Sequence, residues 1–377
     1  MTAEHQRGLA ELAAQGRLRQ LVPRTGLDFS SNDYLGLAES PELRAAVAAA
    51  IERGVPVGSG GSRLLRGNHR EHEILEAEAA SYFGSEAALF FASGFMANFA
   101  IFSTLPQRGD LVVHDALIHA SAHDGMRNGR ATCVAARHND AGDFEAAITR
   151  WREGGGRGRP WIAVESLYSM DGDIAPVDDL AEIARRHDGM LVIDEAHATG
   201  VLGADGRGLA AHLEGAENVI SLHTCGKALG AAGGLVCASR TLCNFLVNRG
   251  RAFVFSTAPP PLQAATVRAA LSLCRHAPER RERLARLVAH AGRELNQCCG
   301  LAASGTHIMP VIVGEEMRSM DLAAALQARG FDVRGVRPPT VPAGTSRLRI
   351  SLTLNVDEAD VSDLVRALGA ELSGRAS

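Results

Sequence analysis

The sequence lacks several features that would assign it to a specialised class of protein. None of its seven cysteines stands in a CxxC pair, and the adjacent Cys298 and Cys299 cannot easily bridge each other. An odd number of scattered cysteines is typical of reduced thiols, so we expect a cytoplasmic protein. The first residues, MTAEHQRGLA, contain no apolar run like that of a signal peptide. No apolar run reaches the roughly 20 residues that a membrane helix needs, so no membrane span is expected.

Charge imbalance and aromatic residues are also scarce. Lys plus Arg number 39 and Asp plus Glu 43, which gives a net charge of -4 without a long basic run. A nucleic-acid partner is therefore not expected, and the Gly/Arg-rich segment 152–159 is typical of a solvated loop. Aromatic residues make up only 5% of the 377 residues. A chain of this length predicts more than one hydrophobic core.

Helix and strand signals alternate through most of the chain. Ser40-Pro41-Glu42 combines a capping serine, an early proline and an acid, which predicts a helix from there to about Arg53. A second helix is expected from about Arg70 to Phe83. The expected strands are Ala87–Phe91, Leu111–His114, Thr132–Ala136, Trp161–Glu165, Leu191–Asp194, Val219–Leu222 and Leu235–Ala238.

This pattern predicts an α/β fold. Short apolar strands separated by helices indicate a mostly parallel sheet covered on both faces. Past the proline run at 259–261 the pattern changes to two long helices, then to strands and helices of a smaller α+β domain. We therefore expect an N-terminal segment at 1–38, a large domain at 39–275 and a small domain at 276–377.

Several polar residues follow the predicted strands, where ligands bind in open α/β sheets. Lys227 lies among small residues after one strand, and Asp194 ends another, three residues before His197. An isolated lysine is more often a surface residue, and Asp194 could also cap a helix or bind a metal. The strand-end position equally suits a carboxylate that faces a pyridine nitrogen.

Other residues have a functional and a structural interpretation. Gly94 opens a helix whose backbone N–H groups could bind a phosphate, although such a turn is also common without a ligand. His119 could stack on a flat cofactor, and with His123 it has the i,i+4 spacing of a metal pair, for which a third ligand is missing. Arg347 and Arg349 share one face of a predicted strand, where both could bind a carboxylate or both could face solvent.

In this order, Gly94-Phe95, His119, Asp194-x-x-His197 and Lys227 resemble the α-oxoamine synthases, which are fold-type I pyridoxal-phosphate enzymes. The resemblance covers nearly the whole chain and implies a mostly parallel seven-stranded sheet with a smaller C-terminal α+β domain. The further matching motifs are SNDYLGL at 31–37, GSGGSR at 58–63, HAS at 119–121, HND at 138–140, SMDGD at 169–173, GRG at 206–208 and FST at 255–257.

The resemblance also implies roles for individual residues. Lys227 would carry pyridoxal 5'-phosphate as a Schiff base, with Asp194 at the pyridine nitrogen, His197 at the phenolic oxygen and His119 stacked on the ring. The remaining cofactor contacts implied are Gly94, Phe95, Ser169 and Thr224, with Ser256 and Thr257 from the neighbouring subunit. The implied assembly is a homodimer with shared sites. Asn32 and Arg349 would hold the amino-acid carboxylate, and Arg19 and Thr340 would line the acyl-donor side.

The segment 337–349, RPPTVPAGTSRLR, resembles the branch of the family that joins L-alanine to a pimeloyl thioester. The pimeloyl carrier could be CoA or acyl carrier protein. A member that uses glycine and acetyl-CoA, an aminotransferase and a non-catalytic subunit of the same fold remain alternatives. Two residues depart from the family pattern: Ala198 stands where glycine is usual, and Arg66 stands where a small or polar residue is usual.

Overall fold

The computed structural model describes residues 2–373, and these form two compact units. The larger unit contains residues 32–288 and 353–355. The smaller unit combines the N-terminal residues up to 31 with 289–352 and the described residues from 356 onward. The bounds expected from the sequence, an N-terminal segment at 1–38, a large domain at 39–275 and a small domain at 276–377, stay a prediction.

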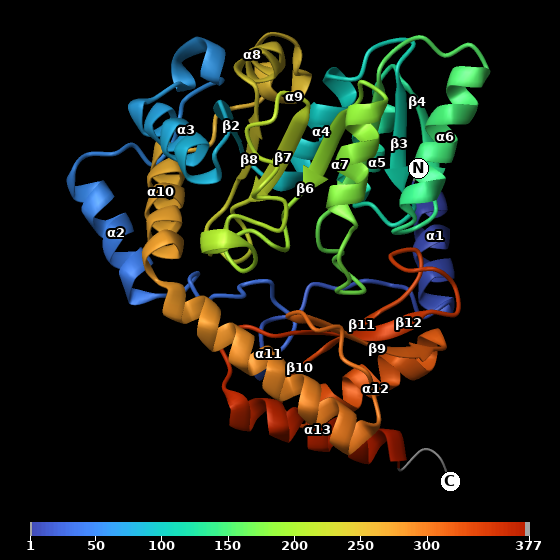
Figure 1. The fold of residues 1–377 in the computed structure, drawn as a ribbon. Coiled ribbons are helices and arrows are strands. Elements are labelled where there is room, and N and C mark those ends of the chain that lie inside the picture. Colours follow the sequence, from blue (N-terminus) through green and yellow to red (C-terminus); the bar gives the residue numbers. More distant parts are fainter. Residues whose placement is uncertain (1, 374–377) are drawn as a thin grey trace. The chain divides into compact units, whose positions relative to one another are not determined.

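A seven-stranded sheet forms the centre of the larger unit, as the sequence predicts (Figure 1). All neighbouring strands are parallel except β8, which runs antiparallel to both β2 and β7. In spatial order the strands are β2 (Ala87–Phe91), β8 (Gly234–Ala238), β7 (Val219–Thr224), β6 (Met190–Asp194), β5 (Pro160–Glu165), β3 (Leu111–Asp115) and β4 (Thr132–Ala136).

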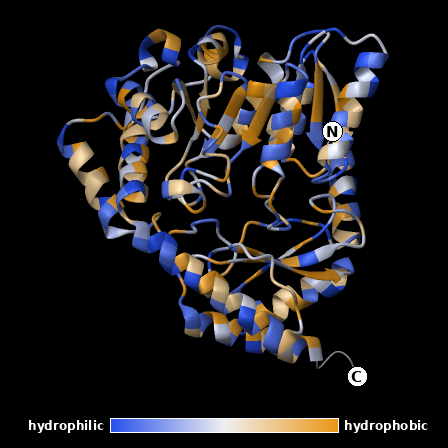
Figure 2. Ribbon diagram, in the orientation of Figure 1, coloured by the Kyte–Doolittle hydropathy of each residue, from blue (hydrophilic) through white to orange (hydrophobic). Residues whose placement is uncertain are grey.

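Alternate residues of the central strands β3, β5 and β6 enter two different hydrophobic cores. Val112 packs in one core with helices α4 and α5, whereas its neighbours Leu111 and Val113 pack in the other core with α6 and α7. The sheet is therefore covered on both faces, and Figure 2 shows its central strands in hydrophobic colours. The helices of this unit are α2 (Pro41–Glu52), α3 (Arg70–Phe83), α4 (Gly94–Thr104), α5 (Ala120–Arg127), α6 (Ala141–Glu153), α7 (Val177–Arg186), α8 (Arg240–Arg249), α9 (Arg251–Val254) and α10 (Pro261–His276).

Strand β4 differs from the fully buried strand that the apolar pattern predicts. Its first four residues, 132–135, are exposed and only Ala136 is buried. The reason is its place at the end of the sheet, where it has β3 as its one neighbour. An edge strand of this kind has one side open to solvent.

Local capping signals set the beginning of the predicted helices. The Ser40 hydroxyl accepts a hydrogen bond from Leu43 N at 3.2 Å and begins α2, followed by proline at the first position. Gly84 ends α3 in the left-handed conformation, at φ 89°. The helix beginning at Ser40 and the one ending at Gly84 are confirmed.

The smaller unit contains a three-stranded antiparallel sheet in the order β11 (Arg334–Val336), β12 (Ser346–Ser351) and β9 (Ile308–Gly314). A parallel pair joins β1 (Leu27–Asp28) to β10 (Phe331–Asp332). Its helices are α1 (Ala3–Ala14), α12 (Glu316–Ala328) and α13 (Glu358–Ser373), while α11 (Pro278–Cys299) contributes residues to both units. Two short helical turns, η1 (Arg63–Gly67) and η2 (Ala204–Gly206), belong to the larger unit. Across residues 2–373, no helix has the length and apolarity to cross a membrane.

Candidate active site

The carboxyl ends of β6 and β7 bring the two strongest sequence candidates to one edge of the sheet. Asp194 is the last residue of β6, and Thr224 is the last residue of the neighbouring parallel strand β7. Lys227 follows Thr224 by three residues in a turn closed by a hydrogen bond from Gly230 N to Lys227 O of 2.8 Å. This edge is where open α/β sheets bind ligands.

The Asp194 carboxylate is buried and held by donors from two directions. Asn98, on α4, donates from Nδ2 to Asp194 Oδ2 at 2.6 Å, and Ala196 N donates to Oδ1 at 2.9 Å. The same Asn98 amide donates to Ser121 Oγ at 3.0 Å, and Ser121 Oγ lies 2.7 Å from His119 Nδ1. A chain of hydrogen bonds thus joins the carboxylate to the histidine expected to stack on a cofactor ring.

His119 is the N-cap residue of α5, and its ring is held as a neutral group. Its Nδ1 accepts a hydrogen bond from Ser121 N at 3.2 Å, which leaves Nε2 as the protonated nitrogen in the neutral form. Burial lowers the pKa of His119, and the charge of Lys227 acts in the same direction against the opposing effect of Asp194. A neutral ring suits stacking on a flat aromatic group better than an imidazolium does.

Lys227 ends a second chain of hydrogen bonds. Its Nζ lies 2.6 Å from His197 Nε2, and His197 Nδ1 lies 2.6 Å from the Tyr34 hydroxyl. Tyr34 in turn donates to Asn32 Oδ1 at 2.9 Å. Four residues from three separate segments therefore meet, and three of them, Asn32, His197 and Lys227, are sequence candidates.

Gly94 forms a cradle at the start of α4 next to Thr224. A Cβ added at Gly94 would lie 3.2 Å from Thr224 Oγ1 and 3.4 Å from its Cβ, so a side chain there would fill the space before the threonine. Ser93 caps the helix by accepting from Met96 N at 3.2 Å, and the first N–H groups of α4 stay available to an anion. Phe95, the next residue, is exposed.

Glu165 is a buried carboxyl group that the sequence interpretation did not include. It ends β5 and pairs in register with Asp194 on β6, and its Oε1 has no hydrogen-bond partner among the described residues. Burial raises the pKa of Glu165 to about 8, with the charge of Asp194 adding to the rise and that of Lys227 opposing it. A buried, unpartnered carboxyl oxygen indicates that a polar group completes this site.

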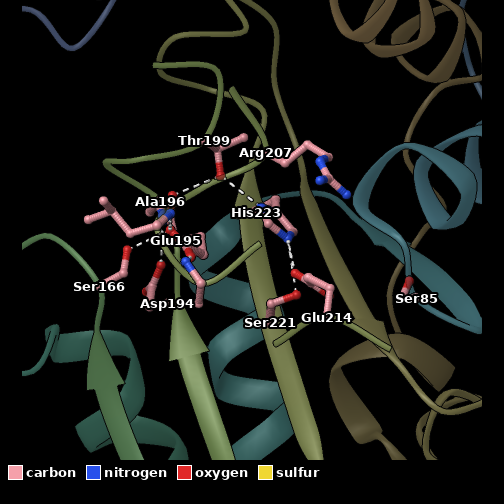
Figure 3. Close-up of polar contacts among 12 residues, drawn as sticks. Ser85, Ser166, Asp194, Glu195, Ala196, Thr199, Arg207, Glu214, Ser221 and His223 are labelled. Atoms are coloured by element: carbon pink, nitrogen blue, oxygen red, sulfur yellow. Dashed lines mark hydrogen bonds and ion pairs between the residues drawn. The ribbon is translucent and has the colours of Figure 1, made fainter. Parts of the chain in front are cut away.

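A buried polar network lies behind Asp194 and holds the following loop (Figure 3). The Glu195 carboxylate accepts from Ser166 Oγ at 2.5 Å, from Leu209 N at 3.1 Å and from Ala210 N at 2.6 Å. Burial raises the pKa of Glu195, and these donors act against that rise. The loop after His197 is thereby tied back to the ends of β5 and β6.

His223 links the same loop to β7. Its Nδ1 lies 2.9 Å from Thr199 Oγ1 and its Nε2 lies 3.1 Å from Glu214 Oε1, both visible in Figure 3. The Phe83 ring stacks on the imidazole at 3.6 Å between centroids. Because His223 precedes Thr224, the network fixes the backbone from which Thr224 and Lys227 extend.

The motifs at 138–140 and 169–173 meet in the structure. His138 Nδ1 lies 2.8 Å from Asp115 Oδ1, and its Nε2 lies 2.7 Å from Asp173 Oδ2. Burial alone would lower the pKa of His138, but the hydrogen bonds and charges of the two carboxylates raise it to about 10. The imidazolium therefore anchors the loop that carries Ser169, which is half-buried.

The remaining candidates for substrate and cofactor binding differ in how far they are buried. Arg349 is buried in the smaller unit, where Nη1 donates to Ser351 Oγ at 2.6 Å, and Arg347 is buried beside it, so neither faces solvent. Arg19 and Thr340 are exposed residues of the same unit. Their contacts with substrate stay predictions. In the larger unit Ser256 is half-buried and Thr257 exposed.

Neither of the two departures from the family pattern removes a chemical group from the candidate site residues. Positive φ outside glycine occurs among the described residues at Asn139, Asp188 and Asp205, so Ala198 adopts a backbone conformation that alanine tolerates. The positive φ in this turn belongs to Gly200, at 82°. Arg66 is exposed on the short π-helical turn η1.

Besides Glu165, the sequence analysis missed one strong signal and three further site residues. Lys227 is the only lysine in the sequence, and every other residue counted as Lys or Arg is an arginine. Arginine cannot form a Schiff base, so a single retained lysine points to that chemistry. Asn98, Ser121 and Tyr34 were not selected, although Asn98 is the one amide in an otherwise apolar stretch of α4, GFMANFAIF.

The residues present fit pyridoxal 5'-phosphate. The anion cradle at Gly94 and Thr224 suits a phosphate, the held carboxylate of Asp194 suits a pyridinium nitrogen, and Lys227 supplies the amine. The unpartnered Glu165 Oε1 leaves an acceptor for a further polar group. The site therefore has a matching group for the phosphate, for the pyridine nitrogen and for the aldehyde carbon of this cofactor.

Comparison with known proteins agrees with this fit. A family model described as "Aminotransferase class I and II" matches residues 24–368. The 8-amino-7-oxononanoate synthase of Anaeromyxobacter sp. (strain K) is 44% identical over 95% of this chain and 89% of its own length. Serine palmitoyltransferase of S. paucimobilis, solved with a bound PLP-myriocin aldimine, has a TM-score of 0.88 at 28% identity, covering 100% of this chain and 98% of that one.

A solved 8-amino-7-oxononanoate synthase of Francisella tularensis has a TM-score of 0.78 at 26% identity, covering 93% of this chain and 99% of that one. The match to the family model extends over most of the chain, and the curated relative is similar over nearly its whole length. The chain belongs to the aminotransferase class I and II family, as a fold-type I pyridoxal-phosphate enzyme of the α-oxoamine synthase type.

Proposed function

We propose that this chain is an 8-amino-7-oxononanoate synthase. It condenses L-alanine with a pimeloyl thioester and releases CO2, the free carrier thiol and 8-amino-7-oxononanoate, a step of biotin biosynthesis. The observation that carries the chemistry is the single lysine, Lys227, whose Nζ lies 2.6 Å from His197 Nε2 at the edge of the sheet that holds Asp194. The similarity to curated synthases supports this choice of substrates.

The cofactor supplies an electron sink that stabilises negative charge at the α-carbon of a bound amino acid. Asp194 would hold a proton on the pyridine nitrogen, because its carboxylate is fixed by hydrogen bonds from Asn98 and Ala196 N. Lys227 Nζ serves as the general base that takes the α-proton and later returns one. His197 holds Nζ in place before and after that transfer.

The substrate-binding residues are proposed from the family resemblance. From the family resemblance, Asn32 and Arg349 hold the alanine carboxylate, and Arg19 and Thr340 line the acyl-donor side. A guanidinium suits this role because it can bind a carboxylate through two parallel hydrogen bonds. Holding the carboxylate of the amino acid in one orientation would be catalysis by positioning.

The proposal includes a homodimer whose sites share residues. The loop at 58–67 is hydrogen-bonded to the segment after Thr257, through Ala258 N to Gly61 O at 2.9 Å and Ser59 Oγ to Pro259 O at 2.7 Å. Apolar side chains on these adjoining segments are exposed, Leu65 by 85% and Phe255 by 71%. Exposed apolar side chains next to Ser256 and Thr257 favour contact with a second copy at this place. The carrier of the pimeloyl group and a cytoplasmic location stay predictions.

Trapping the cofactor on the only lysine tests the site. Borohydride reduction of the protein loaded with pyridoxal phosphate should fix one cofactor per chain, on the peptide that contains Lys227. The variant Lys227→Ala should show no such product and negligible turnover. Label found on the N-terminal amine alone would contradict the assignment.

Substrate preference is tested by absorption spectra and thiol release. The visible band of the loaded protein should change on addition of L-alanine, and pimeloyl-CoA should then release free thiol. A response to glycine with acetyl-CoA, without a response to alanine, would support the family assignment and contradict the proposed substrates. If the protein stays colourless with added pyridoxal phosphate, the assignment as a pyridoxal-phosphate enzyme is wrong.

A further inference from the structure

His223 is a fully buried imidazole to which the proposed chemistry gives no role. It lies one residue before Thr224, at the end of β7. Leu222 and Thr224 point toward Gly94 at the start of α4, since a Cβ added there would lie 3.7 Å from Leu222 Cδ2 and 3.2 Å from Thr224 Oγ1. Successive side chains of a strand point to opposite faces of the sheet. The imidazole therefore packs on the face of β7 opposite to the proposed phosphate cradle.

The end of β7 extends beyond its neighbour β6. The pairing of these two strands ends with Asp194 opposite Leu222, two residues before the end of β7. On its other side, β7 stays paired as far as Thr224, which lies opposite Gly234 of β8. The sheet therefore supports residues 223–224 from the side of β8, and support from the other side must come from the loop that follows β6.

That support reaches β7 through the His223 side chain (Figure 3). Its Nδ1 lies 2.9 Å from Thr199 Oγ1, and its Nε2 lies 3.1 Å from Oε1 of Glu214, whose side chain is 3% exposed. Both partners belong to the loop between β6 and β7. Phe83 stacks on the ring with 13° between the two planes. Contacts at both nitrogens and on one face leave the ring little room to move, so the loop and the end of β7 are held together.

The cradle in front of Thr224 has little spare room. Gly94 is in close contact with β8 as well, because a Cβ added at Gly234 would lie 2.9 Å from Gly94 N. Thr224 and Gly234 are paired across the two strands, so both walls of the cradle move with the end of β7. Hydrogen bonds weaken steeply when distance or direction changes. A small displacement of Thr224 would therefore weaken its contact with a bound phosphate.

We propose that His223 is a positioning residue for the phosphate end of the cofactor. By joining the end of β7 to the loop after β6, it keeps the Thr224 hydroxyl beside Gly94. This inference deepens the proposed function and rests on it in one respect, that the anion in the cradle is the phosphate of pyridoxal 5'-phosphate. The family resemblance implied a role for Thr224 and none for His223.

Two forms of the cofactor separate this role from a general effect on folding. Pyridoxal 5'-phosphate occupies the cradle, whereas pyridoxal has no phosphate and contacts only the rest of the site. In His223→Gln the affinity for pyridoxal 5'-phosphate should fall about tenfold, as expected when a hydrogen bond to a charged group is lost. The affinity for pyridoxal should stay unchanged. Absorbance titration of the full-length protein after removal of cofactor measures both, and an equal fall for the two compounds, or no fall, would overturn the inference.

A double-mutant cycle shows whether His223 acts through Thr224. Thr224→Ala removes the hydroxyl that His223 is proposed to position, so adding His223→Gln to it should cause little further loss of affinity for pyridoxal 5'-phosphate. Losses that multiply in the double variant would mean that the two residues act independently, and the proposed role would be wrong. The matched control is His187→Gln, at a half-buried histidine 3.2 Å from Glu145 and three residues before β6, which should leave both affinities unchanged.

A milder variant keeps the test open if His223→Gln does not fold. Glu214→Gln keeps the shape of the side chain and an acceptor oxygen but removes the charge beside His223 Nε2. The affinity for pyridoxal 5'-phosphate should fall by less than in His223→Gln, and the affinity for pyridoxal should again stay the same. A change that does not distinguish the two compounds would contradict the inference. These titrations need no substrate, and only a failure of the unmodified protein to bind pyridoxal 5'-phosphate would count against the proposed function itself.

Discussion

The side chains around Lys227 divide into groups that local sequence reveals and groups that only the fold reveals. Asp194, His197 and Lys227 follow strand ends, so their positions in the sequence already indicate a shared edge of the sheet. Asn98 and Tyr34 come from a helix interior and a loop, and their contacts with Asp194 and His197 join residues far apart in the sequence. No local pattern predicts such contacts, because they depend on how the elements pack.

Asn98 should be important for cofactor binding. In Asn98→Ala the carboxylate of Asp194 loses its 2.6 Å hydrogen bond while it remains buried. A hydrogen bond to a buried charged group contributes roughly 1.5–3 kcal/mol, so affinity for pyridoxal phosphate should fall at least about tenfold. Titration by absorbance measures this. The control is Asn248→Ala, at an exposed residue whose side chain donates to Asn244 O; equal losses in both variants would contradict the role.

Glu165 should make stability depend on pH. Its pKa is raised from 4.5 to about 8 by burial, then by Asp194, so the folded chain binds this proton more tightly than the unfolded chain does. The resulting stabilisation is fully present below about pH 4.5 and is lost as the pH rises through about 8. Glu165→Gln keeps a neutral polar group and should lose that dependence.

The measurement is the urea midpoint of cofactor-free protein at several pH values between 5 and 9. The decline of the midpoint with rising pH should be smaller in Glu165→Gln than in the unmodified protein. Glu52→Gln, at an exposed position on α2, should keep the original decline. A decline of the same size in Glu165→Gln would show that other groups carry the dependence.

At the scale of elements, hydrophobic periodicity and caps predicted most of the larger unit. Strands β2, β3, β5, β6, β7 and β8 lie within a residue or two of their predicted positions, because each is a short buried apolar run. The helix α1 was not predicted, and none of its residues is buried in the structure. The turn η1 has no sequence signal that distinguishes it from a loop.

The loop after His197 depends on one glycine. Gly208 has φ 108°, and a Cβ there would lie 2.6 Å from Cδ of the buried Glu195. Gly208→Ala should therefore destabilise the protein by more than about 2 kcal/mol, from backbone strain and from displacement of the carboxylate. Gly155→Ala, at φ 90° with nothing within 4 Å, isolates the strain and should cost only about 1 kcal/mol.

Urea unfolding of both variants gives the comparison, and cofactor titration shows whether displacement of Glu195 reaches Asp194. Similar midpoints for the two alanine variants would mean that the carboxylate moves aside freely. In that case the network of Glu195, Ser166 and Ala210 would not fix the loop.

At the scale of the molecule, the sequence predicted a mostly parallel sheet but not the order of its strands. The antiparallel direction of β8, between β2 and β7, follows from how the turn after Lys227 returns the chain. The direction of β8 cannot be predicted from the composition along the chain. The pairing of β1 with β10 joins residues about 300 positions apart, through two residues on each side, and lies beyond any local pattern.

The proposed dimer can be tested by mixing two inactive proteins. Lys227→Ala lacks the amine but keeps Ser256 and Thr257, while a double variant, Ser256→Ala with Thr257→Ala, lacks the groups proposed to reach the partner. A mixed dimer contains one site with the lysine of one chain and the intact pair of the other. Random exchange makes half of the dimers mixed, so about a quarter of all sites should be complete.

The mixture, unfolded and refolded together, should recover about a quarter of the unmodified activity, measured as alanine-dependent thiol release. Each variant treated alone should stay inactive, and size-exclusion chromatography should show dimers throughout. Recovery requires that the two segments act across the interface, because a site built within one chain would gain nothing from exchange. No recovery from mixed dimers would therefore place Ser256 and Thr257 in the site of their own chain, or in no site, while leaving the assignment of Lys227 intact.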